Sequence, residues 1–212
     1  RIIAKNGLLK INNTKIIGLK KLMEVSGIAG KAVESYHIGF IIAPRINAAG
    51  RMDTAKKAIR LLLATDEVEA EHLALELESL NLLRKQAEGV IFEEAVNNIE
   101  TNFLYKKNII VVAGENWHEG VLGIVASKLT EKYEKPSIVI SLKDGVGKGS
   151  ARSFDGIDIF EAFKSADRYL IKYGGHKLAA GLTIAEKDIN AFANELNNYI
   201  QSEGIGNCKE IE

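Results

Sequence analysis

The sequence predicts an α/β fold in which a small mixed sheet with flanking helices follows a long helix and a shorter helical region. Between Ile109 and Leu142, two apolar, β-branched runs enclose a helical pattern, which is typical of a strand–helix–strand unit with a parallel pair. The run from Asp66 to about Asn98 keeps apolar residues at helical spacing and contains no proline. The 212 residues are 46% hydrophobic and 26% charged, an ordinary globular composition that suits one large domain or two small ones.

Short helices and turns are predicted over residues 1–43. In "TKIIGLKKLMEVSG" the apolar residues recur at helical spacing, and Gly27 is the expected stop. "AGKAVESY" predicts a second short helix. Pro44 is expected to stop any helix in "HIGFIIAP", because a proline disfavours helical backbone in the residue before it.

Two further helices are predicted to begin at aspartates. Asp53 is the expected N-cap of "TAKKAIRLLLAT", and Asp66 is the expected N-cap of the long helix. Some 30 helical residues would reach roughly 45 Å, with Gly89 as the weak position. A helix of this length is typical of a connector whose two ends pack on different parts of the protein. Its expected apolar stripe consists of Val68, Leu73, Leu77, Leu80, Leu83, Ala87, Val90, Ile91 and Ala95.

The C-terminal half continues the alternation of strands and helices. "IIVVAG", "KPSIVISL", "GKGSARSF" and "AGLTIA" are predicted strands. "EGVLGIVASKLTEKY", "IDIFEAFKSADRYL" and "KDINAFANELNNYI" are predicted helices. Residues 108–200 are therefore expected to form a compact α/β domain.

The bulk composition argues against several classes of protein. No apolar run reaches the roughly 18 residues of a membrane span, and no signal peptide is evident, so we expect a cytoplasmic protein without a membrane partner. The single Cys208 excludes an internal disulfide and a zinc ribbon. Because 28 Lys and Arg balance 28 Asp and Glu, charge-driven binding of nucleic acid by the whole surface is disfavoured, while a local basic groove stays compatible. The chain opens with Arg1, which suggests a piece of a longer protein.

The residues do not predict a self-contained catalytic or metal centre. None of the four histidines lies in an H-x-H, H-E-x-x-H or D-x-D context, and no C-x-x-C, nucleophile elbow or P-loop is present. His72 lies among glutamates on an expected solvated face, and His37 precedes an apolar run, where a structural role is expected.

The stretch "APRINAAGRMD" is the first candidate binding site. Asn47 to Gly50 reads as a tight loop before a helix, flanked by Arg45 and Arg51. Lys56, Lys57 and Arg60 follow closely, and Asp53 is the one acidic residue near these basic residues in the sequence. The guanidinium group of arginine can bind two phosphate oxygens at once, so this stretch could bind phosphate. The alternative is a helix-entry loop whose arginines bridge two domains through carboxylates.

The stretches "GENWHEGVLG" and "GVGKGSARS" are the second and third candidates. The first follows a strand and opens a helix, where backbone N–H groups can meet an anion, and Trp117 and His118 would offer a stacking surface and a polar tip. The alternative is a loop with Trp117 half-buried on the sheet. In the second stretch, strand alternation places Ser150 and Arg152 on one face as a phosphate clamp, with Lys148 and Ser153 nearby. The alternative is a glycine-rich hairpin edge with solvated charges.

The stretch "KYGGHKLAAGL" is the last candidate. Gly174 and Gly175 would allow a close backbone approach or a positive φ, and His176 would then project from the turn. The small residues that follow would let a ligand or another chain come close. A glycine turn with a structural histidine is the alternative.

Taken together, "GFIIAPRINAAGRMD", "WHEGVLGIVASKL", "GKGSARS" and "GGHKLAAGL", in this order and at this spacing, resemble the RecJ family of the DHH phosphoesterase superfamily. "NLLRKQAEG" on the long helix fits the same pattern, so the resemblance covers essentially the whole chain. It implies a single-stranded-DNA-specific 5′-3′ exonuclease of DNA repair and recombination that uses Mn²⁺ or Mg²⁺. In that family the metals are held by aspartates and histidines of an N-terminal domain, and a long helix leads to the DHH-associated domain.

This sequence departs from the family pattern because it contains no Asp-His-His motif and no other candidate cluster of metal-binding aspartates. An oligonucleotide-binding-fold domain often follows in bacterial members, and we do not expect one within these residues. Residues 1–52 are therefore expected to be the C-terminal tail of the catalytic domain, residues 53–104 a helical connector, and residues 105–212 the DHH-associated domain. We expect the fragment to hold no metal, to contribute no catalytic residue and to show no nuclease activity by itself.

The resemblance also implies roles for individual residues. Arg152 with Ser150 would clamp a DNA phosphate, and Arg51 would contact another, with Ser153 counted in the same phosphate-binding set. His176 would donate to a phosphate, and Gly174 and Gly175 would make room. In the family, the DNA runs in a cleft between the catalytic domain and the DHH-associated domain. The residues expected to line this cleft are Arg45, Asn47, Trp117, His118 and Lys148.

Single-stranded DNA is the expected partner, with single-strand-binding or repair proteins as further candidates and the oligomeric state left open. Two alternatives to an exonuclease remain. One is another DHH-type phosphoesterase acting on short oligonucleotides or cyclic dinucleotides, and the other is a non-catalytic single-strand-binding module. The latter would normally carry several stacking aromatic residues, whereas aromatic residues make up only 7% of this chain.

Overall fold

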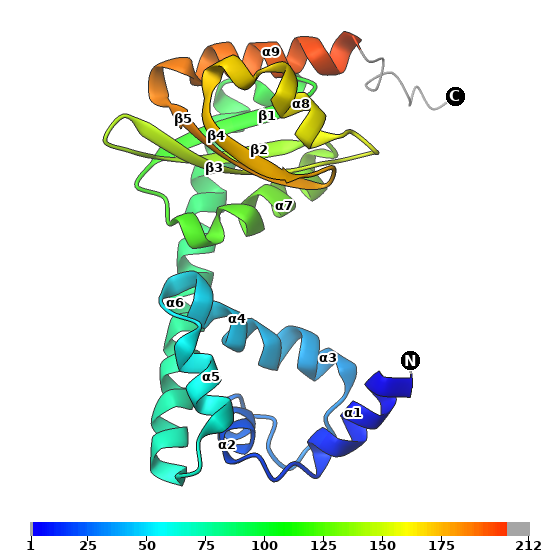
Figure 1. Cartoon of the computed structure of the whole chain (residues 1–212), viewed down its shortest axis with the longest axis vertical. Helices are drawn as coiled ribbons and strands as arrows, with labels where there is room; N and C mark the ends of the chain where they lie inside the picture. Colours follow the sequence, from blue (N-terminus) through cyan, green and yellow to red (C-terminus); the bar gives the residue numbers. More distant parts are fainter. Residues whose placement is uncertain (1, 203–212) are drawn as a thin grey trace. The chain divides into compact units, whose positions relative to one another are not determined.

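A computed structural model describes residues 2–202 of the chain (Figure 1). Arg1 and Cys208 lie outside these residues. The chain divides into two compact units between Gln86 and Ala87, within helix α6 (Glu67–Thr101). The first unit is helical and the second is a mixed α/β unit with a five-stranded sheet, which confirms the predicted fold class.

Helices that pack around one apolar core form the first unit. The largest buried members of this core are Leu22, Leu61 and Leu77, none of which is exposed to solvent. The elements are α1 (Ile2–Asn12), α2 (Ile17–Val25), α3 (Ser35–His37), a π-helical turn (Ile38–Ile42), α4 (Ala43–Met52), α5 (Lys56–Leu63) and the first part of α6.

The prediction that Pro44 stops a helix, with a tight loop at Asn47 to Gly50, was wrong. The chain is helical without interruption from Ser35 to Met52, through one π-helical turn. Pro44 lies in the first turn of α4. Pro44 directly follows the π-helical turn, where the Ala43 N–H bonds the Ile38 carbonyl, five residues back. This shift in the hydrogen-bond pattern falls where Pro44 has no N–H to donate, so the helix continues past the proline.

Helix capping followed the predictions only in part. Asp66 caps α6, and its Oδ1 accepts a hydrogen bond of 2.8 Å from the Glu69 N–H, as predicted. Asp53 instead ends α4, and its N–H donates to the Ala49 carbonyl. Gly27 follows the end of α2 with a positive φ of 72°, as expected of a stop.

The stretch "AGKAVESY" does not form the helix predicted for it. Its first residues are turns and extended chain, and α3 begins only at Ser35. His37 closes a capping box there, because its Nδ1 accepts from the Glu34 N–H at 3.0 Å, which confirms its structural role.

The buried face of α6 differs from the predicted stripe along the middle of the helix. Leu73, Leu77, Ile91 and Ala95 are buried, whereas Val68, Leu83 and Val90 are 77%, 49% and 55% exposed. Between Leu77 and Ile91 the buried face passes through two polar residues, Asn81 and Glu88. The helix therefore packs its two ends on different partners, as predicted, but polar side chains occupy part of the stripe.

The second unit contains a sheet of strand order β1-β2-β3-β5-β4. The parallel pair β1 and β2 confirms the predicted strand–helix–strand unit, and all other neighbours are antiparallel. The strands are β1 (Ile110–Glu115), β2 (Ser137–Lys143), β3 (Val146–Arg152), β4 (Leu170–His176) and β5 (Ala179–Ala185). The helices are α7 (Leu122–Tyr133), α8 (Ile159–Ser165) and α9 (Ile189–Ser202), besides the end of α6.

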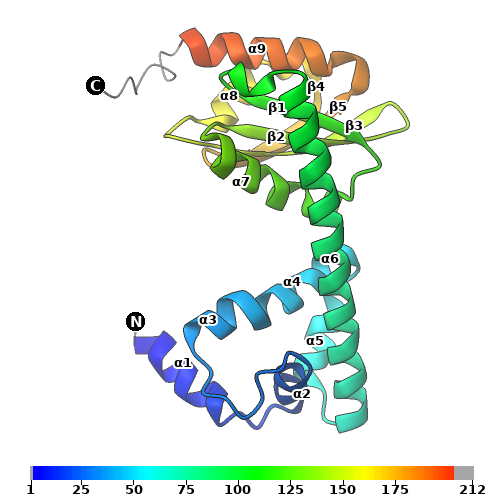
Figure 2. The ribbon, with the colours of Figure 1, turned by 180° about the vertical axis from the view of Figure 1, so that it is seen from behind.

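The two faces of this sheet have different neighbours. Helices α8 and α9 cover one face and α7 lies on the other, as both views of the ribbon show (Figures 1 and 2). The core under α8 and α9 is built around Phe163 and Phe192, whose ring centroids are 5.7 Å apart. On the opposite side, α7 packs on β2 and β3, and no helix of the described residues covers the part of the sheet formed by β4 and β5 (Figure 1).

The Gly-Gly-His stretch forms a strand, which the sequence did not predict. Gly174, Gly175 and His176 end β4 and pair with Gly181, Ala180 and Ala179 of β5. The turn follows at residues 177–178. The prediction that His176 projects from a glycine turn was therefore wrong.

Candidate nucleic-acid interface

Three rows of opposed residues lie on the face of the sheet away from α8 and α9. The register aligns Lys148, Thr183 and Lys172 in one row across β3, β5 and β4. Ser150, Gly181 and Gly174 form the middle row, and Arg152, Ala179 and His176 form the last. Residues directly opposite one another in a sheet project from the same face, so a flat row of small residues lies between two rows that carry basic side chains.

The spacing of these rows follows from strand geometry. Neighbouring rows are two residues apart along β3, and the outer rows are therefore about 13 Å apart. A hollow of about 430 Å³ lies over the first and middle rows, and residues of β3, β5, β4 and the start of α7 line it. Its charged lining side chains are Glu119, Lys148 and Lys172. This surface, from Lys148 and Lys172 to Arg152 and His176, is called the basic sheet face below.

The Arg152 guanidinium is held in place at the start of α7. Its Nη1 donates to Ser150 Oγ at 3.1 Å and to the Ala151 carbonyl at 2.7 Å, so the predicted juxtaposition of Ser150 and Arg152 is present. A Cβ on Gly123, in the first turn of α7, would lie 2.6 Å from Arg152 Nη2. Glycine at this position therefore provides the space that Arg152 occupies.

Lys148 and His176 have defined polar partners. Lys148 forms an ion pair with Glu119 at 3.1 Å between two side chains that are more than half exposed, a contact worth little in stability. His176 is exposed, and its Nδ1 accepts from the Leu178 N–H at 3.2 Å. In the neutral ring the proton therefore lies on Nε2, which leaves that nitrogen as a donor.

Ser153 closes a loop. Its hydroxyl donates to the Ile157 carbonyl and its N–H donates to the Leu178 carbonyl at 3.0 Å. These bonds join the end of β3 to the chain just before α8 and to the β4–β5 turn. The Ser153 hydroxyl therefore already donates its proton to a hydrogen bond within the chain.

The expectation of Trp117 as a stacking surface was wrong. Trp117 is only 7% exposed, and its ring covers Gly114 so closely that a Cβ there would lie 2.2 Å away. Its indole N–H donates to Glu94 at 2.6 Å, and its carbonyl accepts from the buried Ser141 hydroxyl. The ring fixes the loop that carries His118, whose Nδ1 accepts from the Gly120 N–H at 3.1 Å.

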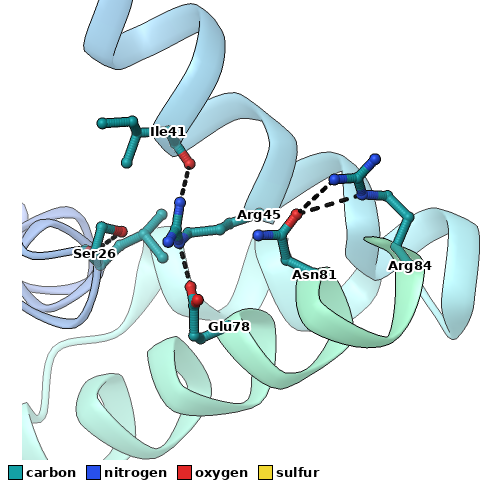
Figure 3. A network of polar contacts seen from close by, with 7 residues as sticks. Ser26, Ile41, Arg45, Glu78, Asn81 and Arg84 are labelled. Carbon is teal, nitrogen blue, oxygen red and sulfur yellow. Dashed lines mark hydrogen bonds and ion pairs between the residues drawn. The ribbon is translucent and has the colours of Figure 1, made fainter. Parts of the chain in front are cut away.

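Arg45 is engaged in the first unit rather than presented as a free phosphate donor (Figure 3). Its side chain, 12% exposed, donates to Glu78 and to the Ile41 carbonyl. The same view shows Arg84 donating to Asn81 Oδ1 at 3.2 and 3.3 Å. The guanidinium of Arg45 therefore joins α4 to α6.

Two other cations of this region, Lys57 and Arg60, are paired with carboxylates of α6, so Asp53 is not the only carboxylate that these two side chains face. Lys57 pairs with Asp53 and Glu76 at 2.9 and 3.2 Å, and Arg60 pairs with Glu69 at 2.7 Å. The hydrogen bond to Asp53, followed by that to Glu76, raises the pKa of Lys57. Asn47 and Arg51 lie one turn apart on α4, and both are exposed.

Neither a metal cluster nor a membrane helix is found in the part of the chain that the structure describes. Within residues 2–202, no three His, Cys, Asp or Glu side chains are grouped so that they could hold a metal ion. Over the same residues, every helix is too short or too polar to cross a bilayer. His72 is exposed and lies 3.6 Å from Glu76, as expected of a solvated face.

Lys172 and Thr183 of the basic sheet face were not predicted from the sequence. They come from β4 and β5, and they join Lys148 and Ser150 only through strand pairing. The available signal was the match in length between "LIKYGGH" and "AAGLTIA" across two residues, which is the spacing of a β-hairpin.

Residues 106–202 match the family model of the DHHA1 domain. The chain is 40% identical over 93% of its length to the single-stranded-DNA-specific exonuclease RecJ of Bacillus subtilis. It is 39% identical over 94% of its length to the RecJ of Thermus thermophilus. The chain spans only 25% and 28% of the lengths of these relatives.

Solved structures agree with this similarity. A crystal structure of RecJ from Thermus thermophilus in complex with Mn²⁺ is similar with a TM-score of 0.82 at 37% identity, over 94% of this chain and 29% of that one. A crystal structure of exonuclease RecJ bound to manganese gives a TM-score of 0.83 at 37% identity, over 95% of this chain and 49% of that one. The chain is therefore similar, over nearly all its length, to a segment of the RecJ exonucleases, and its residues 106–202 match the DHHA1 domain.

Proposed function

We propose that this chain is the accessory, nucleic-acid-binding part of a single-stranded-DNA-specific 5′-3′ exonuclease that hydrolyses phosphodiester bonds in DNA repair and recombination. The names of its relatives and its similarity to them over 93% and 94% of its length support this. The proposal includes a cytoplasmic location and single-stranded DNA as the partner. It places the metal centre in a part of the protein outside this chain, so the chain alone is expected to be inactive.

The observation that carries the proposal is the basic sheet face. Its middle row, Ser150, Gly181 and Gly174, lets a strand of nucleic acid approach the sheet closely. The flanking rows supply Lys148 and Lys172 on one side and Arg152 and His176 on the other. Cationic and hydroxyl donors of this kind bind phosphate oxygens, and they position a strand without reading its sequence.

Each side chain has a role within this proposal. Arg152, already oriented by Ser150, donates its guanidinium to a phosphate, and His176 donates from Nε2. Lys148 and Lys172 add positive charge along the path of the DNA backbone. We also propose that Arg51 contacts a phosphate. Mg²⁺ or Mn²⁺ in the complete enzyme would supply an activated water. This chain's residues would hold and orient the strand.

A salt titration of single-strand binding tests the proposal. The affinity of the protein for a fluorescently labelled thymidine oligonucleotide is measured by anisotropy at several salt concentrations, for the wild type and Lys172→Ala. Loss of one phosphate contact should lower affinity and reduce the slope of log K against log salt by roughly 0.7. Lys187→Ala, an exposed lysine outside the basic sheet face, is the matched control. An unchanged slope in Lys172→Ala, or equal losses in both variants, would contradict the proposal.

A further inference from the structure

The free edge of the sheet forms a second candidate binding surface, remote in the strand order from the basic sheet face. Among residues 2–202, strand β1 lies at the end of the sheet and pairs on one side only, with β2. The Ile110 N–H donates to the Pro136 carbonyl at 2.9 Å, so Ile110, Val112 and Gly114 face β2. The N–H and C=O groups of Val111, Ala113 and Glu115 therefore point to the open side.

A side-chain amide already occupies the start of this edge as a neighbouring strand would. The Asn197 carboxamide accepts from the N–H of Ile109 at 3.3 Å and donates to its carbonyl at 3.4 Å. It also accepts from the Asn108 N–H at 2.8 Å. One amide thus replaces one residue of a pairing strand at Ile109, and among the described residues no hydrogen bond continues the pairing at Val111 or Ala113.

Two adjoining hollows extend this edge into a trough. One, of about 470 Å³, is lined from Leu104 and Lys107 along β1 to α9. The other, of about 340 Å³, continues past Gly114 to Trp117 beside α6. Both include Asn98, Asn102 and Ala113. Figure 2 shows β1 beside α6 at this edge. The asparagines that line the two hollows are Asn97, Asn98, Asn102, Asn190, Asn194 and Asn197.

The chemistry of the trough identifies the kind of occupant. Its lining carries one cation, Lys107, and one anion, Glu94. Because these charges balance, the trough does not provide the row of cations that a phosphate backbone would need. Its asparagine amides can donate and accept, as a peptide backbone requires, and Leu104, Ile189 and Ala193 add apolar contacts. From Val111 to Glu115 the open edge spans about 13 Å, the length of a short strand of about five residues.

We propose that this trough binds an extended, largely uncharged peptide segment of a partner protein, which adds a strand to β1. In this mode main-chain hydrogen bonds to Val111 and Ala113 supply the common part of the affinity, and alternate side chains contact the asparagine and apolar walls. The edge of β1 would otherwise be an exposed template for pairing, which folded proteins normally cover. The proposal is independent of the nucleic-acid proposal because the two surfaces share no residue.

Selection from a phage-displayed library of random dodecapeptides tests this inference. Selected peptides are synthesised, and their affinity for the wild type and variants is measured by fluorescence anisotropy. Ala113→Pro removes an outward N–H without removing a bond to β2, and it should weaken binding at least tenfold. Asn194→Lys should do the same by placing a charge in the trough. Asn198→Lys makes the same change four residues further along α9, at an exposed position that does not line the trough, and should leave affinity unchanged.

Several outcomes would overturn the inference. They are failure to select any peptide, equal binding by wild type and both trough variants, and equal losses in Asn194→Lys and Asn198→Lys. Displacement of the peptides by a thymidine oligonucleotide would assign the trough to nucleic acid. Concentration-dependent dimerisation of the wild type that Ala113→Pro abolishes would assign it to a second copy of the chain.

Discussion

Gly174 and Gly175 are neighbours in β4, yet the structure predicts opposite effects of the same substitution. A Cβ on Gly175 would lie 2.4 Å from the Ala179 carbonyl oxygen and 2.5 Å from the Ala180 Cα, both backbone atoms of β5. Its φ of 156° is a conformation that residues with a side chain rarely adopt. A Cβ on Gly174 would meet nothing within 4 Å.

The magnitudes follow from these contacts. For Gly175→Ala, backbone strain of about 1–3 kcal/mol adds to an overpacking cost of about 1–3 kcal/mol, because β5 cannot retreat without breaking its pairing. A total of roughly 2–6 kcal/mol should lower the melting temperature by about 6–18 °C. Gly174→Ala should leave the melting temperature unchanged or slightly higher, because glycine is unfavourable inside a strand by about 0.5–1 kcal/mol.

Thermal unfolding followed by circular dichroism checks the pair, and oligonucleotide anisotropy separates fold from function. Gly174→Ala places a methyl group on the basic sheet face and should weaken single-strand binding while the fold stays intact. Equal melting temperatures for the two variants would refute the account of Gly175. Unchanged affinity in Gly174→Ala would show that close approach at the middle row is not used.

The remaining predictions concern other parts of the chain. Gly89→Ala should raise stability by about 1 kcal/mol in urea unfolding, since a Cβ there meets nothing within 4 Å and glycine weakens a helix; destabilisation would contradict this. Burial and the 2.7 Å hydrogen bond to Glu100 raise the pKa of Tyr133 above that of an unfolded tyrosine. The stability that Tyr133 contributes is therefore complete below pH about 10 and declines at higher pH, so the stability difference between wild type and Tyr133→Phe should shrink from pH 8 to pH 11. A constant difference would refute the linkage. The purified chain should release no nucleotides from single-stranded DNA with Mn²⁺, and digestion that follows the protein through purification would contradict the proposed location of the metal centre.

The parts of the fold that follow from local sequence periodicity were predicted correctly. The βαβ unit, the closing helix and the Asp66 cap each depend on residues that lie close together in the chain. Strand β4 was missed because two glycines have low strand propensity, and its pairing with β5 stabilises it. The loop predicted at Asn47 to Gly50 is helical because Ala48 and Ala49 are both buried and Ala49 belongs to the core of the first unit.

The polar face of the sheet could be predicted only in part. Ser150 and Arg152 share a strand, so alternation alone placed them together. The positions of Lys172 and Thr183 depend on register, which a single sequence does not specify. The roles of Trp117 and Arg45 were misjudged because their partners, Glu94 and Glu78, are distant in sequence. The buried face of α6 was misplaced for the same reason, since Glu88 pairs with Lys128 of α7.

The most direct test of the central proposal is to locate the DNA on the chain by nuclear magnetic resonance. Backbone amide signals of the ¹⁵N-labelled protein are followed as a thymidine oligonucleotide is added. If the basic sheet face binds the strand, signals should shift at Ser150, Arg152, Gly174 and Gly181, and no shifts should occur at Val111 or Ala113 on the β1 edge. Shifts confined to residues outside the basic sheet face, or no shifts at oligonucleotide concentrations that saturate binding, would contradict this proposal.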